Sequence, residues 1–142
     1  MTIFDVIVVG GGHAGIEAAH AATKFSNSVL LITQRIESIG EMSCNPSIGG
    51  QAKGQIVREI DLLGGLIAKA ADYSAIQYRV LNRRKGPAVQ ATRSQNDKFL
   101  YRSFMRQALF ANKNLSILQE TVSSIDKHTD GLFNLKTSLG FF

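Results

Sequence analysis

A run of glycines directly after a hydrophobic segment is the feature that most constrains this fold. Residues 4–9 are rich in β-branched side chains and too few for a typical helix, which predicts a strand buried on both faces. In residues 10–15, Gly-Gly-Gly-His-Ala-Gly, the glycines Gly10, Gly12 and Gly15 match G-x-G-x-x-G. In a dinucleotide site these three permit a tight turn, close backbone approach to a pyrophosphate and close helix–strand packing.

The residues after the glycines supply the context that this pattern needs. Small residues recur on one helical face over residues 12–25, and residues 28–33 predict a second, parallel strand. The helix N-terminus would direct N–H groups and its positive dipole end at a pyrophosphate. Thr33 and Gln34 stand where an NAD site usually places an acidic residue, which weakens the NAD interpretation. The N-terminal position of the motif favours FAD, and a turn that binds nothing is the alternative.

The remaining pattern alternates helices and strands, which predicts an α/β, Rossmann-like FAD/NAD(P)-binding domain with a parallel sheet and a small β insertion. We expect one domain over residues 1–142. The expected elements are a loop at 34–48, a helix at 52–63, a half-exposed strand at 76–80, a basic turn at 83–87, a returning strand at 88–92, a helix at 95–112, a third parallel strand at 114–119 and a hairpin of 122–125 with 132–137 around Asp130-Gly131.

Composition excludes several classes of protein. The chain is 44% hydrophobic and 19% charged, which argues against disorder, and no apolar run reaches the roughly 20 residues of a membrane span. A single cysteine, Cys44, excludes an internal disulfide and fits a cytoplasmic protein without a signal peptide. No histidines, cysteines or carboxylates have metal-ligand spacing. The apolar end at 139–142 leads us to expect that the sequence stops inside a larger fold.

Cys44 and His13 are the residues with potential chemistry. Cys44 lies in a loop that we expect to lead directly into a helix, whose N-terminus could stabilise a nucleophilic thiolate. A small buried hydrophobic side chain is the alternative. His13 lies inside the glycine turn, where a local polar contact is favoured over a catalytic base. His20 and His128 have no partner pattern, so we interpret them as structural or surface residues.

Cations cluster in the middle of the chain, interleaved with aromatic residues. A nucleic-acid backbone site and an ordinary solvated face are both compatible with this cluster, and the net charge of +5 permits a polyanion such as RNA. The cluster comprises Arg79, Arg83, Arg84, Lys85, Arg93, Lys98, Arg102 and Arg106, with Tyr78, Phe99 and Tyr101.

Three motifs together resemble the glucose-inhibited division protein A family. They are Gly-Gly-Gly-His-Ala-Gly-Ile-Glu-Ala-Ala at 10–19, Gly-Glu-Met-Ser-Cys-Asn-Pro-Ser-Ile-Gly-Gly at 40–50, and Lys-Gly-Pro-Ala-Val at 85–89 followed by Thr92-Arg93. The second and third motifs are far more specific than the first. The resemblance runs from about residue 4 to residue 137, and members also end their second strand in threonine.

The resemblance implies a flavoprotein of tRNA processing, the FAD-binding subunit of the enzyme that adds a carboxymethylaminomethyl group to the wobble uridine of certain tRNAs. It implies that Gly10, Gly11, Gly12, His13, Ala14 and Gly15 hold the FAD pyrophosphate and that the Val122 backbone meets the adenine end. It assigns Cys44 to catalysis, by thiolate addition to C6 of the uracil. It also implies NADH as reductant, a homodimer and a GTPase partner.

Family members are several times longer than this chain. Their NADH-binding insertion, a second proposed catalytic cysteine and a helical partner-binding region lie beyond residue 142. We therefore expect an N-terminal portion with weak or absent activity alone. The alternatives are another FAD-dependent oxidoreductase, disfavoured by the lack of a second cysteine, and an inactive truncated chain.

Overall fold

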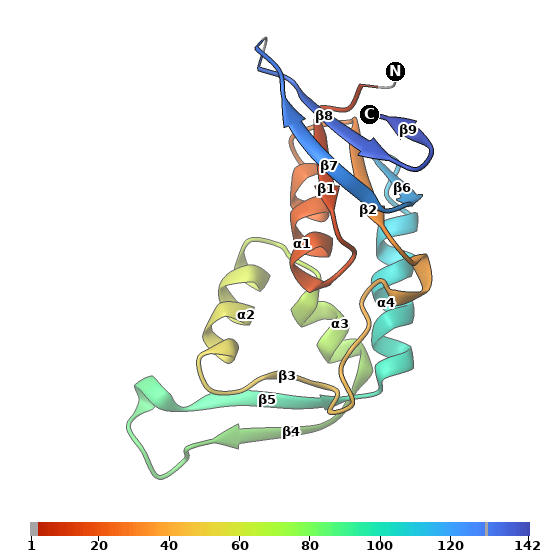
Figure 1. Ribbon diagram of the computed structural model, residues 1–142. Helices are drawn as coiled ribbons and strands as arrows, with labels where there is room; N and C mark the ends of the chain where they lie inside the picture. The colour runs from red at the N-terminus through yellow and green to blue at the C-terminus, as the bar shows by residue number, and fades with distance from the viewer. Residues whose placement is uncertain (1–2, 130) are drawn as a thin grey trace. The chain divides into compact units, whose positions relative to one another are not determined.

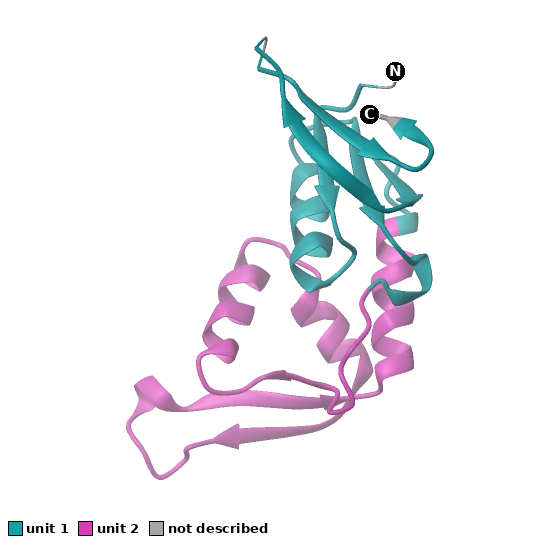
Figure 2. Cartoon of the chain, viewed as in Figure 1, with its two compact units in different colours: residues 1–39, 110–142 teal, residues 40–109 magenta. Residues whose placement is uncertain are grey.

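The computed structural model describes residues 3–129 and 131–142, with only the backbone of Phe141. The chain forms two compact units, one of residues 1–39 and 110–142 and one of residues 40–109 (Figure 2). The first unit carries the glycine turn, and the second carries Cys44 and the whole cationic cluster.

A parallel three-stranded sheet forms the centre of the first unit (Figure 1). Its strands β1 (Val6–Val9), β2 (Val29–Thr33) and β6 (Leu115–Gln119) lie in the order β1-β2-β6, which confirms the three expected parallel strands. All of β2 is buried, as a central strand should be. The expectation that β1 is buried on both faces is wrong, since Val9 is 49% exposed. The reason is that β1 pairs with β2 alone in the described part of the chain.

Helix α1 (His13–Ala22) covers one face of this sheet, with Ile16 and Ala19 fully buried. A small antiparallel sheet covers the other face, where Leu30 and Ile32 of β2 pack against Leu135. That sheet consists of β7 (Val122–Lys127), β8 (Phe133–Thr137) and β9 (Gly140–Phe141). The predicted hairpin is thereby confirmed, although Asp130 of its turn lies outside the described residues.

The second unit is built on an antiparallel sheet, β3-β5-β4, which is the expected β insertion. Its elements are β3 (Ser47–Gly49), α2 (Lys53–Leu62), α3 (Ile67–Ser74), β4 (Ala75–Leu81), β5 (Ala91–Asn96) and α4 (Lys98–Phe110), of which only the last residue belongs to the first unit. The expected loop at 34–48 is partly wrong, because it contains the 3-10 helix η1 (Ile36–Ser38) and the start of β3. The returning strand begins later than expected, since Pro87–Val89 form a 3-10 turn, η2.

Helices α2 and α3 lie on one face of this second sheet (Figure 1). Asn96 fixes α3 there, because its Nδ2 donates to the Ala71 carbonyl at 2.7 Å and lies 3.0 Å from Ser74 Oγ. Ser94 Oγ donates to Asn96 Oδ1 at 2.8 Å. This buried polar network defines which face of β5 meets the helices.

Strand β4 lies at the edge of the sheet and is exposed on both faces, not on one as expected. Helix α4 buries Tyr101, Met105 and Leu109, whereas Leu100 is 46% exposed. No helix in the described part of the chain is long and apolar enough to cross a membrane.

Candidate cofactor site

The glycine turn connects β1 to α1 in the geometry that the motif predicts. Gly10 has φ +106°, a backbone conformation that residues other than glycine rarely adopt. Its N–H donates to the Ile32 carbonyl at 2.7 Å. A Cβ atom on Gly15 would collide with the Gly10 carbonyl oxygen. The turn therefore folds tightly against the first turn of the helix.

Gly12 is the N-cap of α1 and faces open space. Its backbone is extended (φ −75°, ψ 177°), and a Cβ atom built there would have no atom within 4 Å. In the described structure no side chain caps the helix, and its first turn carries no acidic residue. The N–H groups of a first helical turn have no acceptor within the helix, and the dipole makes this end positive. The space over Gly12 and Ala14, both exposed, therefore fits an anion such as a pyrophosphate.

Gly11 explains why a threonine ends β2. A Cβ atom on Gly11 would lie 2.8 Å from Thr33 Oγ1 and 3.0 Å from Ile39 Cγ1, so the buried glycine leaves room for both side chains. Thr33 itself is only 6% exposed. Thr33, which packs against the glycine turn, thus stands at the position where many NAD sites place a carboxylate.

His13 begins α1 and is half-buried. Burial lowers the pKa of its imidazole below the usual 6.5, and the nearby Glu17 carboxylate opposes this shift. The ring is therefore predominantly neutral at pH 7. A neutral ring fits the predicted polar contact and adds no fixed charge to the turn.

The carboxyl ends of the three parallel strands form one edge of the sheet. Val122, the remaining predicted cofactor residue, lies at the same edge as the glycine turn. After β6, the N–H of Glu120 donates to the Thr33 carbonyl at 2.9 Å, just as that of Gly10 donates to Ile32 after β1. Val122 follows as the first residue of β7 and is half-buried against the cluster of Leu30, Ile32 and Leu135. Ligands of open α/β sheets bind outside this edge. The glycine turn and Val122 therefore lie at the edge where a dinucleotide is expected.

Glu120 is a residue at this edge that no sequence pattern indicated. Its carboxylate accepts hydrogen bonds from Ser138 Oγ at 2.6 and 2.8 Å, and from the backbone N–H groups of Ser138 at 3.1 Å and Thr121 at 3.3 Å. Hydrogen bonding from Ser138 lowers the pKa of Glu120 below its usual value. Glu120 therefore links the β6–β7 and β8–β9 turns, a pairing across 18 residues that local spacing does not reveal.

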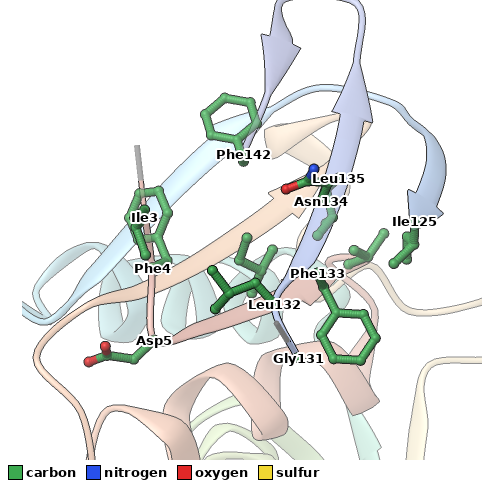
Figure 3. A pocket seen from close by; sticks show the side chains of 12 residues that line it. Ile3, Phe4, Asp5, Ile125, Gly131, Leu132, Phe133, Asn134, Leu135 and Phe142 are labelled. Atoms are coloured by element: carbon green, nitrogen blue, oxygen red, sulfur yellow. The ribbon is translucent and has the colours of Figure 1, made fainter. Parts of the chain in front are cut away.

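A separate hollow of the first unit lies between the N-terminal end of β1 and the β7-β8-β9 sheet. It has a volume of about 550 Å³ and is lined mostly by apolar side chains, among them Phe4, Leu132 and Phe133 (Figure 3). Asp5 is its charged lining residue, and Asp5 Oδ2 accepts a hydrogen bond from Ser26 Oγ at 2.6 Å. A groove with a carboxylate and no cation does not suit a pyrophosphate.

Cys44 lies in the second unit, on an exposed loop. Its exposure excludes the buried-hydrophobe interpretation for the described chain. The expectation that a helix follows directly is also wrong, because β3 intervenes and α2 begins only at Lys53. The positive φ angles of Gly49 and Gly50 end the strand and delay the helix. The exposure of Cys44 is compatible with a reactive thiol. No helix N-terminus follows it directly, so the expected stabilisation of its thiolate is not supported.

Comparison with known proteins places this geometry in a family. The model of the family described as glucose inhibited division protein A matches residues 5–140, nearly the whole chain. The chain belongs to the glucose inhibited division protein A family. GidA of Aquifex aeolicus, in its form II crystal, is 48% identical with a TM-score of 0.90, and the match covers 96% of this chain. The form I crystal gives the same identity and score over 98% of this chain.

The family portion present here is short. The chain spans 23% of the length of the A. aeolicus GidA chain. A GidA-related protein from Thermus thermophilus is 17% identical with a TM-score of 0.58, over 98% of this chain and 48% of that one, which shows the fold alone. The α/β fold with a parallel sheet and small antiparallel sheets is thus confirmed.

Proposed function

We propose that this chain is the FAD-binding N-terminal part of an enzyme that adds a carboxymethylaminomethyl group to C5 of the wobble uridine of certain tRNAs. The observation that carries the proposal is the open position over Gly12, at a helix N-terminus without an acidic first turn, in a member of the GidA family. Family membership favours this proposal over another FAD-dependent oxidoreductase.

Residues 10–15 would hold the pyrophosphate of FAD. Gly10 and Gly15 set the shape of the turn, while the backbone of Gly12, His13 and Ala14 would face the phosphate oxygens. Gly11 accommodates Thr33 and Ile39. The Val122 backbone would meet the adenine end, because β7 starts at the same sheet edge. When bound, FAD supplies hydride transfer to or from a one-carbon unit.

Cys44 would act on the uridine. Its thiolate would form a bond from Sγ to C6 of the uracil, and the C5–C6 electron pair would make C5 nucleophilic toward the one-carbon unit. Loss of the C5 proton and departure of the thiolate would restore the ring. The exposed position of Cys44 is compatible with attack on a large substrate.

The rest of the proposal concerns the longer protein. NADH would serve as reductant, and the protein would form a homodimer and work with a GTPase partner in the cytoplasm. These features are proposed for the longer protein because the chain spans only 23% of the length of A. aeolicus GidA.

Competition for the site tests the cofactor proposal. The full chain is titrated with FAD, monitored by flavin fluorescence, in the presence of ADP, adenosine or riboflavin. Because the proposed cradle recognises a pyrophosphate, ADP should displace FAD at the lowest concentration. Equal competition by riboflavin, or no FAD binding at all, would contradict the proposal.

A further inference from the structure

The net positive charge of this protein arises from one hairpin. The segment from β4 to β5, residues 75–96, contains five cations and no acidic residue. These five account for the whole formal net charge of +5, since the other 11 Lys and Arg residues are matched by 11 Asp and Glu residues. They are Arg79, Arg83, Arg84, Lys85 and Arg93, and we call this segment the basic hairpin.

Strand pairing places two of these arginines directly opposite one another. Arg79 of β4 pairs with Arg93 of β5, and Arg93 pairs with Gly49 of β3. Directly opposite residues of an antiparallel pair share a face, with Cβ atoms about 4.5–5.5 Å apart. Both guanidinium groups therefore project from one face of the sheet, beside a β3 residue with no side chain.

The neighbouring row on this face is polar and uncharged. Gln77, Gln95 and Ser47 pair across the three strands and share the face of the arginines, since they stand two residues away along each strand. The two rows thus offer guanidinium, amide and hydroxyl groups, all of which donate hydrogen bonds.

This face is the one that α2 and α3 leave uncovered. Ser94 and Asn96 alternate with Arg93 and Gln95, and Asn96 is hydrogen-bonded to α3. The side chains of Arg93 and Gln95 therefore point to the opposite side of the sheet. Arg79 and Gln77 are exposed, and Arg93 and Gln95 are partly exposed. We call this side the open face.

The two arginines repel each other without compensation from the protein. In the described part of the chain, neither guanidinium makes an ion pair or a hydrogen bond, and the same holds for the side chains of Gln77, Gln95 and Ser47. Like charges directly opposite in a sheet are destabilising. A pair of arginines in this arrangement matches one phosphate, which two guanidinium forks can grip together.

We propose that the open face binds the phosphate backbone of RNA, with Arg79 and Arg93 as a clamp on one phosphate and Arg83, Arg84 and Lys85 extending the contact along the strand. This inference rests on the proposed tRNA function and names the surface that the RNA meets. RNA fits the open face better than an acidic protein segment does. The amide and hydroxyl row beside the clamp can contact sugar hydroxyls and base edges, which a carboxylate-rich peptide lacks.

Variants of the full chain test the clamp. Arg79→Gln, Arg93→Gln and the double variant are measured for binding to bulk tRNA by filter binding across salt concentrations. Lys69→Gln, an exposed cation of α3 outside the hairpin, is the matched control. Each arginine variant should weaken binding about threefold to tenfold and lower the salt slope by about 1. The control should change neither quantity.

Folding and the guanidinium geometry are checked separately. Removing one arginine relieves repulsion, so the melting temperature should stay the same or rise by about 1–3 °C. Arg79→Lys keeps the charge but loses the fork, and it should retain the salt slope while binding more weakly than the wild type.

The outcomes separate the clamp from the proposed function. If the wild type binds tRNA and the arginine variants match the control, the clamp is overturned and the tRNA function stands. If the wild type binds FAD but no tRNA at any salt concentration, the tRNA function fails and the clamp fails with it. If the arginine variants lose a binding to polyglutamate that the wild type shows, while their binding to tRNA is unchanged, the open face is assigned to an acidic protein and the proposal is overturned.

Discussion

Gly15 of α1 lies so close to Gly10 of the turn that a Cβ atom on Gly15 would collide with the Gly10 carbonyl oxygen. This contact joins the helix to the end of β1 through backbone alone. It also fixes the direction in which the first helical turn points, and with it the position of the space over Gly12.

Gly15→Ala should therefore unfold the turn. The backbone carbonyl of Gly10 cannot move away as a side chain could, so we expect a loss of about 2–4 kcal/mol of unfolding free energy. Thermal denaturation should show a melting temperature lower by roughly 10 °C. Gly12→Ala is the control, because its Cβ meets open space. A Gly15→Ala variant as stable as the wild type would contradict the close approach of Gly15 to Gly10.

Gly12→Asp should separate folding from cofactor binding. An aspartate at this extended N-cap can accept a backbone hydrogen bond and complements the helix dipole, which should add about 0.5–1 kcal/mol of stability. The same carboxylate would stand where we place the pyrophosphate, so FAD affinity should fall about 100-fold or more. Fluorescence titration and thermal melting measure the two effects. Unchanged FAD affinity in this variant would place the cofactor elsewhere.

His13 should make stability depend on pH. Burial lowers its pKa in the folded state below the 6.5 of the unfolded chain, so the unfolded chain binds more protons between these two values. The contribution of the neutral ring is complete above pH 6.5 and is lost as the pH falls through the folded-state pKa. Urea denaturation between about pH 7.5 and 5 should show this decrease, and His13→Gln should reduce it. A variant with the same pH dependence would assign the effect to other groups.

Ser138→Ala should raise the pKa of Glu120. Hydrogen bonds from the serine stabilise the carboxylate, so their loss moves the pKa back toward its usual value. In the wild type this contribution to stability is present above the unfolded-state pKa of 4.5 and is lost as the pH falls through the lower folded-state value. Carboxyl chemical shifts followed by NMR measure the change. A pKa that is the same in both proteins would exclude this link.

Cys44 should react with iodoacetamide in the folded chain. Its exposure predicts complete labelling without denaturant, detected by mass spectrometry. In the corresponding full-length protein, Cys44→Ser should abolish modification of tRNA and leave flavin bound. Retained modification would remove the catalytic role.

The local pattern of the first unit was readable from the sequence. Short apolar runs and the glycine spacing predicted the three parallel strands, and Asp130-Gly131 indicated the hairpin that the structure confirms. The degree of burial of β1 could not be predicted from the sequence. An apolar strand looks the same whether or not a second neighbour covers its edge, so the exposure of Val9 emerged only from the sheet order.

Two further features depend on contacts between distant segments and could not be predicted from local sequence patterns. The short strand β3 carries too few residues for a periodic signal, and it separates Cys44 from the helix that sequence spacing placed beside it. The link between Glu120 and Ser138 joins two turns that are adjacent only after β7, β8 and β9 pair.

Residue identity and short spacing were enough to predict the glycine turn, the family and the concentration of cations between residues 79 and 93. The chain carries these features before it folds. Folding was needed to pack Thr33 on Gly11, and to set Arg79 and Arg93 opposite each other on one side of a sheet. Contacts of this kind depend on strand register, and register is set when distant segments pair.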